Sequence, residues 1–176
     1  MLDALIPGIQ DHSLSPQDRF NIQTDLYALA RANHVNYIDY LKLLRQAYKY
    51  EDNLTVWKSI LRQLTDLNSI FDYSNLSTIK PLFHKYVRDL LGQIYNKLDW
   101  DPLPNEGIQS AMLRGLILIQ LGINGHKKVC DEAHKRFEKL IENPNHSSIN
   151  PNIRSAIYLT VAKTGNQQTF EQLKTV

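Results

Sequence analysis

The stretch LTVWKSILRQLTDLNSIF, residues 54–71, decides the fold class of this chain. Its apolar residues recur at steps of three and four, and they are Leu54, Trp57, Ile60, Leu61, Leu64, Leu67, Ile70 and Phe71. This spacing places them on one face of an α-helix, because the helix turns once every 3.6 residues or so. Residues 79–98 repeat the pattern with equal regularity. Strand-like alternation is rare, so the sequence predicts an all-α protein.

The same periodicity, read along the whole chain, predicts about eight helices. We expect them at 16–32, 37–49, 54–71, 78–97, 107–121, 126–142, 151–164 and 167–175. Ser15 and Asn150 each precede a proline, which is a common way to begin a helix. Asn33, Gly122 and Gly165 suit the left-handed position that follows a helix end.

The spacing of the helices predicts how they pack. Taken in pairs, the helices start near 16, 54, 107 and 151, at steps of 38, 53 and 44 residues. These steps lie around the range of HEAT and armadillo repeats, so we expect antiparallel helix hairpins stacked into a curved array. A compact helical bundle is the alternative.

The chain reads as a single all-helical domain over 1–176. Residues 1–15 form a lead-in segment, and a loop at 99–106, rich in proline and acid, separates two four-helix halves. Both ends carry apolar residues without a polar cap, as the first part of a larger helical domain would.

Composition excludes several classes of protein. The chain has 176 residues, 43% of them hydrophobic and 22% charged, which is typical of a soluble globular domain. Its net charge of +2 gives no reason to expect nucleic acid or a membrane surface as a partner. Its one cysteine allows no internal disulfide, and no apolar run is long enough to cross a bilayer.

A search for catalytic motifs finds none. The chain has no His-Glu-x-x-His sequence, no glycine-rich phosphate loop and no Gly-x-Ser-x-Gly elbow. His126, Cys130 and His134 are spaced by four on one predicted helix, and a neighbouring pair of them could chelate a metal. A partly exposed structural row beside the core is the favoured interpretation. We therefore predict no catalytic and no metal-binding residue in this chain.

Arginines in apolar surroundings are the strongest candidates for buried ion pairs. Arg114 is the only charged residue between Ile108 and Asn124, so its guanidinium needs a carboxylate, several carbonyls or an anionic ligand in a cavity. An ion pair is the favoured interpretation. Arg19 and Asp25 are six residues apart on one helix and do not face each other, so we expect each to pair with a neighbouring helix.

Five short motifs, in this order, resemble the helical C-terminal domain of zinc aminopeptidases. They are Asp18 to Ala32, Glu51 with Val56-Trp57, Leu98-Asp99-Trp100-Asp101-Pro102, Leu113-Arg114, and Pro151 to Tyr158. Asp99 stands where the family usually has a glycine. The resemblance covers essentially the whole chain.

This resemblance implies a curved helical domain that covers the zinc site of a cytoplasmic parent enzyme and helps enclose peptide substrates. The zinc motif and the Gly-x-Met-Glu-Asn motif of the family belong to an earlier domain, so the partners would be that missing catalytic domain and peptides, with zinc bound outside this chain. The matched residues are expected to be structural, as ion pairs for Arg19, Asp25, Arg114 and Arg154, and as packing residues for Trp57 and Trp100.

Two other functions remain open at this point. The chain could be a stand-alone helical-repeat module that binds peptides or a protein partner. It could also be a small metal protein that uses the His126, Cys130 and His134 row.

Overall fold

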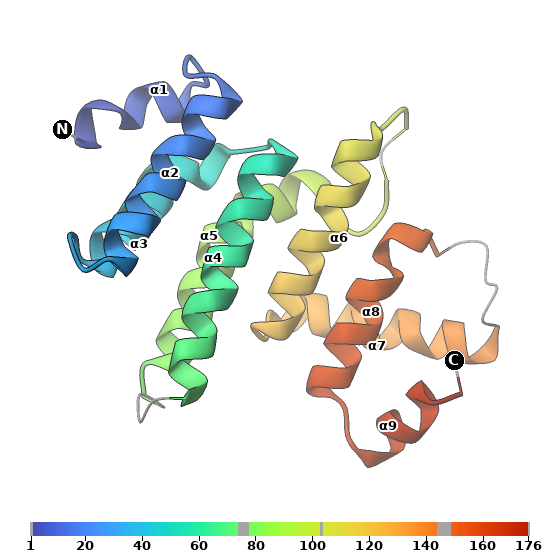
Figure 1. Ribbon diagram of the computed structural model, residues 1–176. Coiled ribbons are helices and arrows are strands. Elements are labelled where there is room, and N and C mark those ends of the chain that lie inside the picture. The colour runs from blue at the N-terminus through green and yellow to red at the C-terminus, as the bar shows by residue number, and fades with distance from the viewer. Residues whose placement is uncertain (1, 74–77, 103, 144–148, 176) are drawn as a thin grey trace. The chain divides into compact units, whose positions relative to one another are not determined.

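The computed structural model describes residues 2–73, 78–102, 104–143 and 149–175, and every regular element in these ranges is helical (Figure 1). The long helices are α2 (Pro16–Arg31), α3 (Tyr37–Ala47), α4 (Leu54–Tyr73), α5 (Lys80–Leu98), α6 (Ile108–Ile123), α7 (Lys127–Glu142), α8 (Pro151–Thr164) and α9 (Gln167–Leu173). Three short ones, η1 (Leu2–Ala4), α1 (Ile6–Gln10) and η2 (Tyr48–Tyr50), complete the set. The all-α prediction is confirmed, and the eight predicted segments correspond to the eight long helices.

Local capping chemistry explains where these helices begin. The Ser15 side chain accepts a hydrogen bond from the backbone N–H of Asp18, and the Asp18 side chain accepts one from the backbone N–H of Ser15. This reciprocal arrangement satisfies amide groups that the first turn of α2 leaves without a helical partner. Asn150 caps α8 in a similar way, by accepting from the backbone N–H of Asn152.

The helix ends differ from the sequence expectation at two glycines. Asn33 adopts the left-handed conformation expected of it, with φ of 60°. Gly122, however, lies inside α6, and the left-handed residue beyond that helix is Gly125, with φ of 73°. Gly165 follows α8 with φ of −80°, which any residue can adopt. Gly122 therefore does not end α6, and its lack of a side chain matters for packing against α8 instead.

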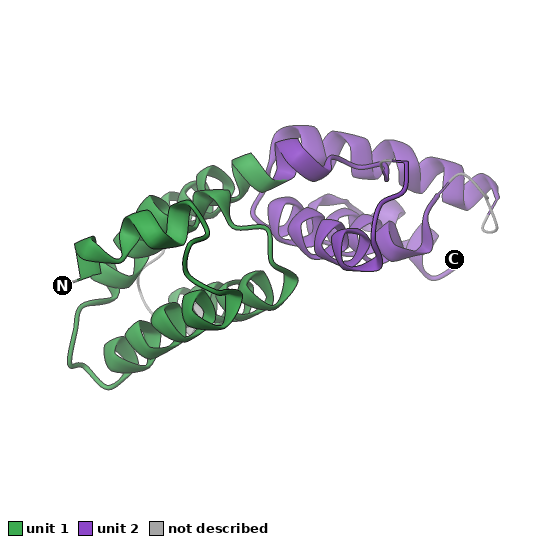
Figure 2. Ribbon diagram, turned by 90° about the horizontal axis from the view of Figure 1, so that it is seen from above, with its two compact units in different colours: residues 1–94 green, residues 95–176 purple. Residues whose placement is uncertain are grey.

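The chain divides into two compact units, residues 1–94 and 95–176, shown in green and purple in Figure 2. In the first unit α2 packs against both α3 and α4, and α1 of the lead-in segment packs against α3. The rings of Phe71 of α4 and Phe83 of α5 pack at a tilt of 59°, with their centres 5.1 Å apart. This unit thus contains two antiparallel hairpins whose first helices, α2 and α4, lie against each other.

In the second unit α6 packs against α7 and α8, and α8 also contacts α7 and α9. The boundary between the units falls inside α5, between Ile94 and Tyr95, and the loop at 99–106 belongs to the second unit. Residues 1 and 103, which belong to the lead-in segment and to that loop, lie outside the described ranges. None of the described helices has the length and apolar content that a bilayer-spanning helix requires.

Two glycines of α6 allow α8 to approach closely. A Cβ atom on Gly115 would lie 2.6 Å from the backbone carbonyl oxygen of Asn152. A Cβ on Gly122, two turns further along, would overlap the side chain of the fully buried Thr160. Both glycines therefore face α8, and the second unit depends on the absence of side chains along this line of contact.

We predict that Gly115→Ala lowers the free energy of unfolding by about 1–3 kcal/mol, because the added methyl group would have to displace the α8 backbone. Gly92→Ala in α5 is the matched control, since a Cβ there meets nothing within 4 Å. Alanine is the better helix former, so this control should stabilise the chain by up to about 1 kcal/mol. Thermal unfolding followed by circular dichroism measures both, and equal effects of the two substitutions would contradict the close approach.

Candidate functional site

The first unit is organised around the guanidinium of Arg19, on the buried face of α2. Its Nε donates to Glu51 Oε2 over 2.7 Å, and its Nη2 donates to Glu51 Oε1 over 3.0 Å. The third nitrogen, Nη1, donates to the carbonyl oxygen of Leu14 over 2.7 Å. Both charged side chains are almost fully buried, at 3% and 1% exposure, so this is a two-point ion pair removed from water.

The ion pair is also the centre of a wider network. Glu51 Oε1 accepts from the backbone N–H groups of Asp52 and Asn53, and the Glu51 carbonyl accepts from Trp57 Nε1 over 2.8 Å. The hydroxyl of Tyr48 donates to the Arg19 carbonyl over 2.6 Å. The hydrogen bonds to Glu51 raise the pKa of Arg19 above its usual value, so the guanidinium stays protonated. The network joins α2, η2 and the start of α4.

The second unit is organised in a comparable way around Arg114 of α6, whose side chain is 1% exposed. Its Nε donates to the carbonyl oxygens of Leu98 and Asp99, at 3.0 and 3.1 Å, and its Nη2 donates to Glu106 Oε2 over 2.5 Å. The guanidinium thus binds the carbonyl end of α5 and a carboxylate of the following loop. The sequence left three kinds of partner open for Arg114, namely a carboxylate, carbonyls or an anionic ligand. The structure shows a carboxylate and two carbonyls bound to the guanidinium, so it is not available to an anionic ligand.

Asp99 lies in this junction with φ of 47°, a left-handed conformation. Such a conformation suits glycine, and aspartate adopts it more readily than most residues. The Asp99 side chain accepts a hydrogen bond from the backbone N–H of Trp100 over 2.8 Å.

Trp100 of the second unit packs against a charged side chain, that of Arg136. Its indole is buried, and the Arg136 guanidinium lies over the ring at 4.9 Å from the ring centre. Arg136 also forms two hydrogen bonds to the Asp101 carboxylate, at 2.8 and 2.7 Å, and a third to Glu132. The hydrogen bond from Arg136 holds the pKa of Asp101 below its usual value. These contacts of Arg136 connect the loop after α5 to α7. Trp57, the other tryptophan, is fully buried in the first unit.

The other two residues expected in ion pairs, Asp25 and Arg154, have different surroundings. Asp25 is exposed on α2 and forms no ion pair with the described residues, because the buried face of that helix runs through Arg19, Gln23 and Tyr27 instead. Arg154 is half-buried on α8, and its Nε has no hydrogen-bond partner within the described ranges.

Neither cluster of potential metal ligands fits a zinc site. His126 caps α7, with Nδ1 accepting from the backbone of Val129, and its ring packs on Tyr95. The Cys130 thiol points to the Gly122 carbonyl, and His134 bonds to Thr164, so the row is directed to separate partners. Within the described residues one other group, His12 with Glu51 and Asp52, brings its ligand atoms within 4.8 Å. There both carboxylate oxygens of Glu51 are already bound to Arg19.

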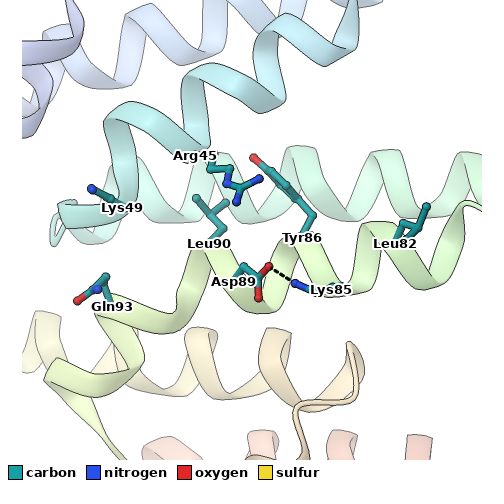
Figure 3. Close-up of a pocket in the computed structure, with 8 residues that line it drawn as sticks. All are labelled: Arg45, Lys49, Leu82, Lys85, Tyr86, Asp89, Leu90 and Gln93. Carbon is teal, nitrogen blue, oxygen red and sulfur yellow. Dashed lines mark hydrogen bonds and ion pairs between the residues drawn. The ribbon is translucent and has the colours of Figure 1, made fainter.

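A hollow of about 480 Å³ lies on the first unit between α3 and α5, and we call it the α3–α5 groove. It is lined by Arg45, Lys49, Leu82, Lys85, Tyr86, Asp89, Leu90 and Gln93. Figure 3 shows Arg45 and Tyr86 directed toward each other across it, with Leu82 at one end and Lys49 and Gln93 at the other. Three of the lining side chains are basic and one is acidic.

Comparison with known proteins assigns the family. Residues 1–176 match the family model described as the ERAP1-like C-terminal domain. The chain therefore belongs to this family, and the resemblance to the helical C-terminal domain of aminopeptidases is confirmed.

The curated relatives are aminopeptidases. Aminopeptidase M1 of Arabidopsis thaliana is 30% identical over 172 residues, which cover 94% of this chain and 19% of that protein. Aminopeptidase M1-A of Oryza sativa subsp. japonica is 28% identical over 163 residues, which cover 91% of this chain and 18% of that protein. Puromycin-sensitive aminopeptidase of Caenorhabditis elegans is 27% identical over 173 residues, 98% of this chain and 18% of that protein. The chain thus spans about a fifth of the length of the curated relatives it matches.

Removing one partner of the Arg19–Glu51 pair should be far more damaging than removing both. We predict that Glu51→Gln lowers the free energy of unfolding of the first unit by about 3–5 kcal/mol, because it leaves a buried guanidinium without its counter-charge. The double variant Arg19→Met/Glu51→Leu should recover much of this loss. In a Trp100→Phe background the fluorescence of Trp57 reports on the first unit alone during urea unfolding.

The control for this series is Asp89→Asn, which breaks an exposed ion pair in the same unit. In that pair Lys85 Nζ lies 2.7 Å from Asp89 Oδ2. An exposed pair of this kind contributes at most about 1 kcal/mol. A Glu51→Gln variant as stable as Asp89→Asn would contradict the central position given to the buried pair.

Buried tyrosines should make the first unit sensitive to alkali. Burial raises the pKa of Tyr27 to about 12, and it raises the pKa of Tyr40, Tyr48 and Tyr86 as well. A tyrosine of the unfolded chain ionises at about pH 10. The stability that comes from keeping Tyr27 protonated in the folded chain is therefore complete below that pH, and it is lost as the pH rises through about 12.

We predict that Tyr27→Phe makes the fall in stability between about pH 10 and 12 shallower, because phenylalanine has no proton to lose. Urea unfolding at a series of pH values measures the slope. Tyr50→Phe, at an exposed tyrosine of the same unit, is the control and should retain the wild-type slope. Identical slopes for Tyr27→Phe and the wild type would contradict the burial of Tyr27.

Proposed function

We propose that this chain is part of the C-terminal helical domain of a zinc aminopeptidase of the puromycin-sensitive type. The match to the ERAP1-like C-terminal domain along residues 1–176 carries this proposal. The relatives, which include a puromycin-sensitive aminopeptidase, support it. Such a parent enzyme would remove single residues from the N-terminus of peptides, in the cytoplasm.

Within that enzyme the chain would form part of the wall of the chamber that holds the peptide, and it would contribute no catalytic group. Its sequence contains neither the His-Glu-x-x-His nor the Gly-x-Met-Glu-Asn motif. Zinc, bound by the rest of the enzyme, would supply an activated water molecule for hydrolysis of the peptide bond. The immediate partners of this chain would be that catalytic part and the peptide substrate.

The buried arginine centres support a structural contribution of this kind. A wall that encloses substrate has to hold its shape, and the Arg19 and Arg114 networks fix the junctions between consecutive helices by several hydrogen bonds each. Both guanidinium groups are occupied by protein partners and are therefore not available to bind substrate.

We predict that the isolated chain hydrolyses no aminoacyl-coumarin substrate, with or without added zinc, because its sequence lacks the His-Glu-x-x-His motif, which supplies two zinc ligands and a general base. The matched control is the full-length natural protein at the same molar concentration, which should release coumarin and lose this activity with 1,10-phenanthroline. Turnover by the isolated chain that a metal chelator abolishes would contradict the proposal.

A further inference from the structure

The α3–α5 groove has more positive charge than its own acidic residues balance. Lys85 pairs with Asp89 at 2.7 Å, which leaves Arg45 and Lys49. Arg45 is exposed and makes no hydrogen bond or ion pair with the described residues. Lys49 lies over the ring of Tyr50, at 4.6 Å from its centre, with no carboxylate beside it in the described part of the chain. The groove therefore presents two unbalanced cations.

The floor of the groove strengthens the attraction of these cations for an anion. Leu90 is buried beneath it, and the Tyr86 ring packs against Phe83 at 6.3 Å between centres. Tyr86 also donates a hydrogen bond from its hydroxyl to the Leu41 carbonyl over 2.7 Å, which fixes α5 to α3. Charges beside an apolar floor are less screened than charges on an open surface, and the fixed spacing keeps the groove formed without a ligand.

The length of the groove favours a peptide over a single small ion. Leu82 and Gln93 lie at its two ends and are eleven residues apart on α5. At about 1.5 Å per residue this corresponds to roughly 16 Å, the length of about five residues of extended chain. The chemistry along it is mixed, since Leu82 is 68% exposed at one end and Gln93 offers an amide at the other. A small inorganic anion would use neither end.

Another cavity of the first unit lacks this character. It holds about 560 Å³ between the lead-in segment, α2 and α3, and its charged lining residues are Asp3, Asp39 and Lys42. Lys42 lies 3.8 Å from Asp39, so its charge is balanced.

We propose that the α3–α5 groove binds an extended acidic peptide segment of about five residues. Carboxylates of the segment contact Arg45 and Lys49, and an apolar residue of the segment packs on Leu82. This site goes beyond the proposed function, because it requires neither the zinc centre nor the rest of the parent enzyme.

The test uses the 176-residue chain and the fluorescein-labelled peptide Leu-Glu-Glu-Glu-Glu, with blocked termini so that only side-chain carboxylates carry charge. Fluorescence anisotropy should give saturable one-site binding. The double variant Arg45→Glu/Lys49→Glu should weaken it by at least about tenfold, because it replaces both attractive contacts with repulsive ones. Leu82→Ser should weaken it a few-fold without changing its dependence on salt.

The matched control is Lys58→Glu/Arg62→Glu, which makes the same change of charge at the same spacing on the exposed face of α4. It should leave the affinity within about twofold of the wild type, because these residues lie outside the groove. Circular dichroism verifies that each variant is folded, and a peptide with lysine in place of glutamate should not bind.

Three results would overturn the proposal. The first is equal weakening by the two double variants, which means general electrostatic attraction. The second is full competition by tripolyphosphate together with no effect of Leu82→Ser, which means a simple anion site. The third is the absence of saturable binding at peptide concentrations of about 1 mM.

Discussion

The ion pair between Arg19 and Glu51 is the interaction on which the first unit depends. Burying two charges is costly, and the cost is offset only when the geometry is good and every remaining polar atom finds a partner. Here the guanidinium bonds both carboxylate oxygens and the Leu14 carbonyl, while Glu51 also receives two backbone N–H groups. The Trp57 indole then bonds to the backbone of the same glutamate. One charged pair thereby fixes the lead-in segment, α2 and the start of α4 relative to one another.

In the second unit the buried charge of Arg114 is stabilised in a comparable way, by the carbonyl end of α5 and the Glu106 carboxylate. In both units a buried arginine stabilises a junction between helices rather than a reacting group. The helices around it then pack by close contact, as α6 and α8 do along Gly115 and Gly122. A framework of this kind leaves its outer surfaces, including the α3–α5 groove, free to differ in charge and shape without affecting the core. This division is consistent with the structural contribution proposed for the chain.

The features that the sequence predicted are the local ones. Apolar periodicity and the caps at Ser15 and Asn150 located the eight long helices, because both signals lie within a few residues of the element they define. The burial of Arg114 followed from its apolar neighbours. The pairing of Arg19 with Glu51 could not be derived from spacing, since the two residues are 32 positions apart and meet only after α2 and α4 pack. For the same reason sequence reasoning did not identify Glu106 or Arg136 as partners, nor the contact of Gly122 with Thr160, nor the groove that α3 and α5 form together.

The central claim, that this chain is a non-catalytic part of an aminopeptidase, is tested most directly by the mass of the native protein that contains it. An antibody raised against the chain, used on a lysate of the source organism, gives that mass in one blot. The account predicts a band about five times heavier than 20.4 kDa, because the chain covers only 18–19% of the length of its relatives. It also predicts that the antibody precipitates aminopeptidase activity together with this band. A single band near 20.4 kDa, without precipitated activity, would contradict the account and identify a free-standing helical module.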